Sequence, residues 1–305
     1  MNENSNFFIN KKILIYGLGK SGISSFKFLK KRNQVFLFDD NNKIKLNSYT
    51  KKNLISLSHI KKIKFDLIVI SPGINNKKYK LNKFLKKNSK IIYTDLDVFY
   101  SFYKNLCITI TGTNGKSTTC QLLHQVLKKQ KYDVRLVGNI GYPILSIKKI
   151  NEDTIFVIEA SSYQLEYSKL FKSKYAAILN ISPDHLERHG TIDNYISAKL
   201  KLIKNQNKNS IALINKFDKF IQNRIKKIKY KSKIIKVDTK LKKKLINIFH
   251  NEYFLSASNI ENLSFVIELA KKFNVKKSNL IQTVKKFKGL NYRQQIIFRN
   301  KKISI

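Results

Sequence analysis

Short apolar runs that end in small or polar residues recur along this chain and restrict its fold more than any other feature. Six of these runs lie at 13–16, 67–70, 108–110, 155–158, 176–179 and 211–214. Helical patterns, as at 118–129 and 263–272, separate or follow them. Continuous apolar runs of this length are typical of strands buried on both faces of a parallel sheet. The sequence therefore predicts an α/β protein with doubly wound parallel sheets.

The residues that follow these runs indicate where ligands would bind. They are Gly17, Ser71, Thr111, Glu159, Asn180 and Asn215. In open parallel sheets, ligands bind beyond the carboxyl ends of the strands, which is where these residues are expected. Ordinary strand-end turns are the alternative, but six clusters with chemically useful side chains favour binding sites.

The length of 305 residues predicts two domains, at ~150 residues per domain. We place a Rossmann-like domain at 1–98 and a P-loop-type α/β domain at 99–296. The acidic and aromatic segment TDLDVFYSFYKN forms a bridge between them. The segment 201–250 is Lys-rich and irregular, and residues 297–305 would begin a further unit.

The charge balance is strongly basic, with 61 Lys and Arg against 19 Asp and Glu and a formal net charge of +42. Such a charge usually indicates a nucleic-acid or membrane-surface partner. Here the lysines are spread through nearly every segment beside many Asn and Ile, and no helix-turn-helix or aromatic-basic platform is visible. We therefore expect no nucleic-acid partner, although the positive field would favour polyanionic small substrates such as nucleotides.

Cysteine usage and hydropathy bear on the compartment. Cys107 and Cys120 are too few for a disulfide framework, so we expect both in the core of a protein from a reducing compartment. The N-terminus lacks the pattern of a signal peptide, and no apolar run approaches the ~20 residues that a membrane span requires. We expect a cytoplasmic protein without membrane insertion.

A glycine-rich segment, GLGKSG at 17–22, follows the first apolar run and fits the pattern G-x-G-x-x-G. Gly17 permits a tight turn, Gly19 lets a diphosphate approach the backbone, and Gly22 lets the following helix pack closely. Asp39 ends the next strand at about the spacing of a ribose-binding acid. The pattern indicates a diphosphate ligand without naming the nucleoside, so an NAD-dependent oxidoreductase stays open, as do glycines that serve only packing.

A second segment, TGTNGKSTT at 111–119, departs from the usual phosphate-loop pattern because Ile110 stands where the first glycine belongs. Its two glycines and the backbone around Asn114 can still form an anion-binding nest at a helix N-terminus. Lys116 would then reach the β- and γ-phosphates, and the hydroxyl of Ser117 could hold Mg²⁺. A glycine turn with a chance Lys-Ser pair is the less favoured alternative.

Glu159 is the carboxylate that we expect to bind Mg²⁺, because phosphate-loop proteins often place an acid at the end of a neighbouring strand. It could instead cap Ser161 or Ser162 locally. In the segment NISPDHLERHG, His185 follows Asp184 at a strand end, which favours a metal or phosphate site, whereas we interpret His189 as structural.

Four motifs taken together resemble the Mur ligases. TGTNGKSTT, VGNIGYP, EASSYQLE and LNISPDHLERHG occur in this order, with GLGKSG and SPGI before them and GLNYR after them. SSYQLE is most similar to the members that join D-glutamate to UDP-N-acetylmuramoyl-L-alanine. The resemblance implies an ATP-dependent ligase of peptidoglycan precursor synthesis that works through an acyl phosphate.

The resemblance also implies roles for individual residues. The expected catalytic residues are Lys116, His185 and Lys199, of which Lys199 matches the lysine that the family carbamylates. The expected metal ligands are Ser117, Glu159, His185 and Lys199. ATP would contact Gly112, Thr113, Asn114, Gly115, Lys116, Ser117, Thr118, Asn262 and Arg293. The UDP-muramoyl substrate would contact Gly17, Leu18, Gly19, Lys20, Ser21, Asp39, Ser71, Pro72, Gly73, Asn139, Ser161 and Gln164.

The chain departs from the family pattern at several places. Asn41 stands where an Arg often contacts uracil, Ser258 replaces a His, and Asn291-Tyr292 replaces Pro-His. The family has a third domain that recognises D-glutamate, so we expect this chain to be an incomplete, monomeric form that binds substrate but ligates slowly or not at all. A folylpolyglutamate synthetase-like ligase is the alternative, since it shares the phosphate loop.

Overall fold

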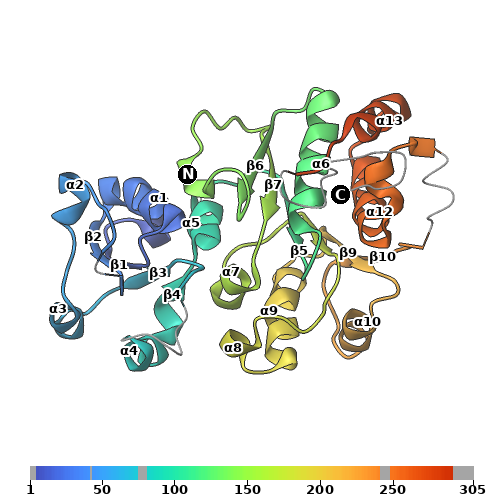
Figure 1. Ribbon diagram of the computed structural model, residues 1–305. Coiled ribbons are helices and arrows are strands. Elements are labelled where there is room, and N and C mark those ends of the chain that lie inside the picture. The colour runs from blue at the N-terminus through green and yellow to red at the C-terminus, as the bar shows by residue number, and fades with distance from the viewer. Residues whose placement is uncertain (1–4, 42, 75–80, 241–247, 291–305) are drawn as a thin grey trace.

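The computed structural model describes residues 5–41, 43–74, 81–240 and 248–290, which form two units that are each built on a β-sheet (Figure 1). The strands of the first sheet lie within residues 12–93, and those of the second lie within residues 107–237. All strand pairs in both sheets are parallel. The predicted α/β fold with parallel sheets is therefore confirmed.

The first sheet has four strands in the order β2-β1-β3-β4. They are β1 (Lys12–Tyr16), β2 (Gln34–Phe38), β3 (Leu67–Ile70) and β4 (Ile92–Tyr93). The strand order reverses between β1 and β3, and the pairing of Tyr16 with Ile70 places the loops that follow these two strands side by side. Such a reversal opens the crevice in which α/β sheets bind ligands.

Helices cover both faces of the first sheet. They are α1 (Lys20–Leu29), α2 (Ser48–Lys51), α3 (Leu57–Lys62) and α4 (Asn82–Lys87). Side chains alternate between the faces of a strand, so Ile13 of β1 packs in the same cluster as Phe26 of α1, while Leu14 packs with Ile60 of α3. Both faces are apolar, as the continuous runs predict.

The second sheet has six strands in the order β10-β9-β8-β5-β7-β6. They are β5 (Cys107–Thr111), β6 (Val134–Gly138), β7 (Ile155–Glu159), β8 (Tyr175–Ile178), β9 (Ile211–Asn215) and β10 (Lys233–Val237). The chain places β6 and β7 on one side of β5 and then crosses to β8 on the other side. The loop after β5 therefore lies at the point where the strand order reverses.

Two groups of helices cover the second sheet (Figure 1). Leu123 and Leu263 belong to the cluster on one face, and Leu165 and Leu200 belong to the cluster on the other. The first face carries α6 (Lys116–Lys129), α12 (Ala257–Lys272) and α13 (Lys277–Lys286). The remaining helices are α7 (Ser162–Tyr167), α8 (Leu186–His189), α9 (Ile192–Lys204) and α10 (Lys219–Ile225).

One further helix, α5 (Asp95–Phe102), connects the two units (Figure 1). The ring of Phe99 contacts Phe156 of the second sheet at 4.8 Å between centroids, and Phe102 contacts Phe28 of α1 at 5.0 Å. One hydrophobic cluster consequently contains residues of both sheets. The segment that we interpreted as a bridge is a packed helix, and the predicted boundary between residues 98 and 99, which stays a prediction, falls inside it.

The structure agrees with some of the remaining sequence-based expectations and differs from others. The segment 201–250, which we read as irregular, contains β9, α10 and β10. Cys107 and Cys120 are buried and unpaired, as predicted for core residues. Residues 291–305, with Asn291, Tyr292, Arg293 and the expected start of a further unit, lie outside the described residues. Within the described ranges, no helix is long and apolar enough to cross a membrane.

Candidate functional site

The phosphate loop lies between β5 and α6, at the centre of the second sheet. Gly115 has φ +80° just before α6 begins, and a Cβ at this position would lie 1.9 Å from Oδ1 of Asn262. Only glycine fits such a position. Asn262, a predicted ATP contact on α12, is buried, and its Oδ1 has no hydrogen-bond donor among the described residues. The backbone amides at the start of α6 are suited to bind an anion.

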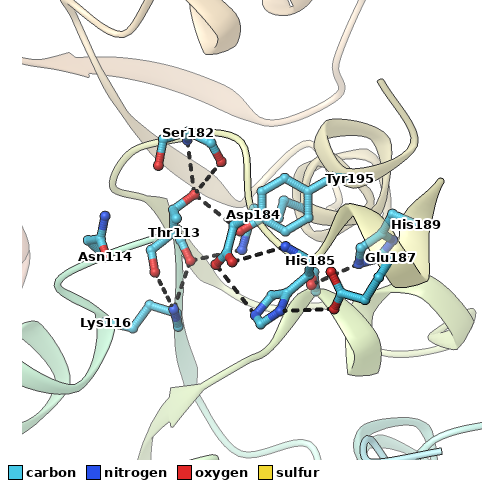
Figure 2. Close-up of polar contacts among 12 residues, drawn as sticks. Thr113, Asn114, Lys116, Ser182, Asp184, His185, Glu187, His189 and Tyr195 are labelled. Carbon is cyan, nitrogen blue, oxygen red and sulfur yellow. Dashed lines mark hydrogen bonds and ion pairs between the residues drawn. The ribbon is translucent and has the colours of Figure 1, made fainter. Parts of the chain in front are cut away.

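The loop is held in place by the segment that follows β8 (Figure 2). The amide of Asn114 donates to Oδ1 of Asn180 at 2.8 Å, and the amide of Thr113 donates to the carbonyl of Asn180 at 2.9 Å. Oγ1 of Thr113 accepts from the amide of Ser182 at 3.0 Å and lies 3.1 Å from the hydroxyl of Tyr195. The loop shape therefore depends on residues far away in the sequence.

Two lysines converge on one carbonyl of the phosphate loop. Nζ of Lys116 donates to the carbonyls of Gly112 and Thr113 at 2.9 and 2.7 Å, and Nζ of Lys199 donates to the Gly112 carbonyl at 2.8 Å. Lys199 is only 1% exposed. Burial, and next the charge of Lys116, lowers the pKa of Lys199 to about 7, although Asp184 and Glu159 oppose the shift. The two amino groups thus lie next to each other at the phosphate loop.

Glu159 ends β7 and provides a buried carboxylate with one unused oxygen. Its side chain is 1% exposed, and Oε1 accepts from Nδ2 of Asn139 at 2.9 Å. Oε2 has no hydrogen-bond partner among the described residues. An unpaired buried carboxylate oxygen is costly, and a divalent cation would satisfy it. Ser117 is also buried, so the two expected Mg²⁺ ligands of this part of the site fit an oxygen-binding ion.

His185 lies in a left-handed backbone conformation, with φ +52°, at the start of α8. Its imidazole is nearly half exposed and lies 3.4 Å from Oδ2 of Asp184 and 3.7 Å from Oε1 of Glu187 (Figure 2). His189, by contrast, is buried and pairs with Oγ of Ser162 at 3.0 Å, which fits our structural interpretation of it. No group of three His, Cys, Asp or Glu suited to a metal occurs in the described part of the chain, so the expected metal set depends on Ser117 and Lys199 as well.

One cavity of about 270 Å³ lies between the two units and is lined by all three predicted catalytic residues, Lys116, His185 and Lys199. Pro72 and Gly73 line it from the first unit. The second unit contributes Lys116, Asn139, Ser161, Ser162, Tyr163, His185, Tyr195 and Lys199. Sequence reasoning missed Ser162, Tyr163 and Tyr195, although two of them stand inside the quoted SSYQLE motif.

Arg188, which the sequence analysis also missed, joins the two sides of this cavity. It is almost completely buried, and its NH1 donates to the carbonyl of Pro72 at 2.8 Å. Its guanidinium lies 3.8 Å from the ring centre of Tyr163, and its Nε lies 3.6 Å from Oε2 of Glu166. The loop after β3 is thereby fixed to the loop that carries His185.

The glycine-rich loop of the first unit is tightly packed on its inner side. A Cβ at Gly22 would lie 1.8 Å from the carbonyl of Gly17, which is why α1 can start so close to the turn. Oγ of Ser71 donates to the same carbonyl at 2.6 Å, and Oδ2 of Asp39 accepts from the amide of Leu18 at 2.6 Å. A Cβ at Gly19 would meet nothing within 4 Å, so this side of the loop is open to a ligand.

Four other predicted site residues lie outside the cavity lining. Ser21 and Gln164 both donate hydrogen bonds to Asp95, where the two units meet. Lys20 is exposed beside the glycine-rich loop, and Oγ1 of Thr118 lies 3.3 Å from the hydroxyl of Tyr253. The glycine-rich loop itself does not line the cavity, which the first unit borders through Pro72 and Gly73 of the loop after β3.

Comparison with known proteins gives two matching family models. The Mur ligase middle domain matches residues 110–281, and the MurD-like N-terminal domain of Mur ligases matches residues 11–93. UDP-N-acetylmuramoylalanine–D-glutamate ligase from Caldicellulosiruptor bescii is 32% identical over 317 residues, which cover 94% of this chain and 69% of that protein. The same ligase from Rickettsia felis is 34% identical over 309 residues, covering 94% and 68%.

A solved structure shows the same fold. The UDP-N-acetylmuramate:L-alanyl-γ-D-glutamyl-meso-diaminopimelate ligase from Neisseria meningitides superposes with a TM-score of 0.58. The superposition covers 92% of this chain and 99% of that chain at 14% identity, which supports the fold alone.

Proposed function

The chain belongs to the Mur ligase family, and from this premise we propose that it carries the substrate and ATP sites for joining D-glutamate to UDP-N-acetylmuramoyl-L-alanine. Members of this family use ATP. The γ-phosphoryl group would pass from ATP to the L-alanyl carboxylate, and ADP would leave. The amine of D-glutamate would then attack the acyl carbon, lose a proton and displace phosphate, which leaves an amide in a peptidoglycan precursor.

The observation that carries this proposal is the cavity shared by the two units. Pro72 and Gly73, beside the glycine-rich loop, line the same space as Lys116 and Lys199 of the phosphate loop region. A substrate with its diphosphate at the first loop could therefore extend its acyl end toward a nucleotide bound at the second.

The charges around this cavity suit phosphoryl transfer to a carboxylate. The reaction brings the L-alanyl carboxylate next to the γ-phosphate of ATP. Because both groups are anionic, positive charge must lie close to their oxygens. Lys116 begins α6 directly after the phosphate loop and lines the cavity. This position supports a role for Lys116 in binding the γ-phosphoryl group during its transfer. Asn139 holds one oxygen of Glu159 and leaves the other available to a cation.

Glu159, Ser117, His185 and Lys199 would hold Mg²⁺ in this proposal. The ion would neutralise phosphate charge during transfer. The low pKa of Lys199 supports the expected carbamylation, because a carbamate forms from the neutral amine and CO₂. Carbamylation would convert this neutral amine on α9 into an anionic metal ligand.

The first unit would bind the UDP part of the substrate. The open side of Gly19, the neighbouring Lys20 and Ser21, and the loop Ser71-Pro72-Gly73 all border the crevice between β1 and β3. The two alternatives are not favoured: the relatives named above are D-glutamate ligases, whereas neither a folylpolyglutamate synthetase nor an NAD-dependent oxidoreductase accounts for the match to the MurD-like N-terminal domain. Monomeric state and cytoplasmic location stay predictions.

Calorimetric titration with UDP-N-acetylmuramoyl-L-alanine tests the proposal. We expect micromolar binding of this nucleotide and no heat from NAD under the same conditions. Binding of NAD, or of neither ligand, would contradict the proposed substrate. The measurement does not depend on turnover, so it separates substrate recognition from the ligase activity of this chain, which stays a prediction.

A further inference from the structure

A buried carboxylate that the chemistry above does not use lies where the two units meet. Asp95, at the first position of α5, is 4% exposed. Its Oδ2 accepts from Oγ of Ser21 at 2.5 Å, and its Oδ1 accepts from Nε2 of Gln164 at 3.1 Å and from the amide of Leu96 at 3.0 Å. One carboxylate therefore holds a side chain from each unit.

The hydrogen bonds continue from Asp95 to the cavity. Oε1 of Gln164 accepts from the amide of Ser161 at 3.2 Å, and Ser161 lines the cavity. At the other end, Ser21 belongs to the glycine-rich loop at which we propose that the diphosphate binds. Ser21, Asp95, Gln164 and Ser161 thus form an unbroken path from the diphosphate loop to the reaction cavity.

Stabilising α5 is not sufficient to explain Asp95. Asp97, two residues later, already accepts from the amide of Thr94 at 2.9 Å and so caps the start of the helix. Asp97 also accepts from Oγ of Ser168 and from three successive amides at 169–171, which fastens α5 to the second unit. Among the described residues, the side chain of Asp95 accepts hydrogen bonds only from Ser21, Gln164 and the amide of Leu96.

The electrostatics of Asp95 support the same view. Burial raises the pKa of the Asp95 carboxyl, and the nearby Asp97 adds to that effect, while the three hydrogen bonds oppose it. Asp95 forms no ion pair with a Lys, Arg or His in the described ranges. A buried acid that only neutral donors hold fixes the positions of those donors, and here they come from both units.

We propose that Asp95 is a positioning residue that couples the diphosphate loop to the reaction cavity, by holding Ser21 and Gln164 at the same time. The proposal rests on the proposed function, because it takes the muramoyl nucleotide as the ligand. A nucleotide that engages Ser21 acts on Asp95, and Asp95 acts on the Ser161–Gln164 turn. By linkage, ligand contacts in the cavity affect the diphosphate loop by the same factor.

The test compares two ligands that differ in reach. UDP fills only the diphosphate loop, whereas UDP-N-acetylmuramoyl-L-alanine also enters the cavity, so the ratio of their Kd values measures what the cavity adds. We expect Asp95→Ala to reduce this ratio by about tenfold, within the usual range of coupling between sites, while Kd for UDP changes much less. Calorimetry on the full chain gives both constants.

Two further variants separate positioning from general stability. In Asp95→Asn, Oδ1 can still accept from Gln164 and Leu96, and Nδ2 can donate to Ser21, so we expect this variant to keep the wild-type ratio. Ser168→Ala removes a hydroxyl from the neighbouring Asp97 and leaves the path intact, so we expect lower stability with an unchanged ratio. Asp95→Asn also keeps the test informative if Asp95→Ala does not fold, because the side-chain amide signal of Gln164 should then still move when UDP is added.

The outcomes distinguish this proposal from the proposed function. If Asp95→Ala shifts both Kd values by one factor, or shifts neither, Asp95 is structural and the coupling is wrong. If UDP leaves the NMR signal of the Gln164 side-chain amide unmoved in the wild type, binding at the diphosphate loop does not affect Gln164 and the proposed coupling is wrong. If the wild-type chain binds neither nucleotide, the proposed function and the coupling fall together, which the wild-type titration alone reveals.

Discussion

Lys199 combines burial with a second lysine nearby, and this has consequences for stability. Its pKa is lowered from 10.5 to about 7, so the unfolded chain binds more protons than the folded one between these values. Stability should therefore rise with pH between about 7 and 10.5. Below pH 7 the folded protein should bear the full free-energy cost of burying the charged Lys199 side chain. A shift of this size corresponds to on the order of 5 kcal/mol, at about 1.4 kcal/mol per pKa unit.

We expect Lys199→Met to stabilise the protein relative to wild type, and to do so more at pH 6 than at pH 9, by about 2–3 kcal/mol. The neutral side chain has no proton to lose, so its stability lacks this pH dependence. Urea unfolding at both pH values measures the difference. Lys204→Met, an exposed site on the same helix, is the control and should show no such change. An identical effect of Lys199→Met at both pH values would mean that folding does not lower the pKa of Lys199.

Gly115 is confined both by its backbone angle and by a neighbouring side chain. Alanine there would combine a positive φ with a Cβ 1.9 Å from Oδ1 of Asn262. We expect Gly115→Ala to cost about 1–3 kcal/mol of stability and to abolish ATP binding, because either the loop or Asn262 must move. Gly19→Ala, whose Cβ would meet nothing, should unfold within about 0.5 kcal/mol of wild type. Urea titration and ATP calorimetry of both variants provide the comparison, and normal ATP binding by Gly115→Ala would refute the expected fit.

The helix α5 does more than connect the two sheets. Oδ1 of the buried Asp97 accepts from Ser168 and from the amides of Lys169, Leu170 and Phe171. Removing this acceptor leaves several buried donors unpaired, at about 1–3 kcal/mol each. We expect Asp97→Ala to lose at least about 3 kcal/mol in urea unfolding, against about 1 kcal/mol for Ser168→Ala. Similar losses in the two variants would show that the amides find other partners.

The elements that sequence reasoning found and missed differ in a physical way. Strands buried on both faces, such as β3 and β5, appear as continuous apolar runs and were predicted to within a residue. The edge strand β6 carries the partly exposed Arg135, β10 carries the exposed Lys233 and Lys236, and β4 has only two residues, so none of them gives such a run. In α5 the polar residues Asp95 and Asp97 are buried, so the helix has no polar face to reveal its period.

The site divides in the same manner. Residues inside motifs, such as Lys116 and Glu159, could be proposed from their position after a strand. Tyr195 lies one helical turn before Lys199, so the period of α9 could have placed both on one side. The contact of Arg188 with Pro72 depends on how two sheets pack together, and no local pattern contains that information.

For the whole molecule, the shared core makes a prediction about cooperativity. One hydrophobic cluster runs from the first sheet through Phe99 to the second, so neither unit can lose its packing without exposing the other. We expect a single urea transition, with tyrosine fluorescence and circular dichroism superimposable. Phe99→Ala should reduce the free energy of unfolding by about 3–5 kcal/mol and thereby lower the urea midpoint of this transition. Two separate transitions in the wild type would show that the units fold independently.

The contact between Gly115 and Asn262 has a further consequence, which concerns the time at which the site is made. The phosphate loop emerges from the ribosome early, whereas the helix that supplies Asn262 emerges only after the whole second sheet has been synthesised. A nascent chain thus carries a phosphate loop that lacks Asn262 beside it until α12 has been synthesised. Nucleotide capture would then be delayed until α12 has been synthesised, so that shorter nascent chains do not sequester ATP.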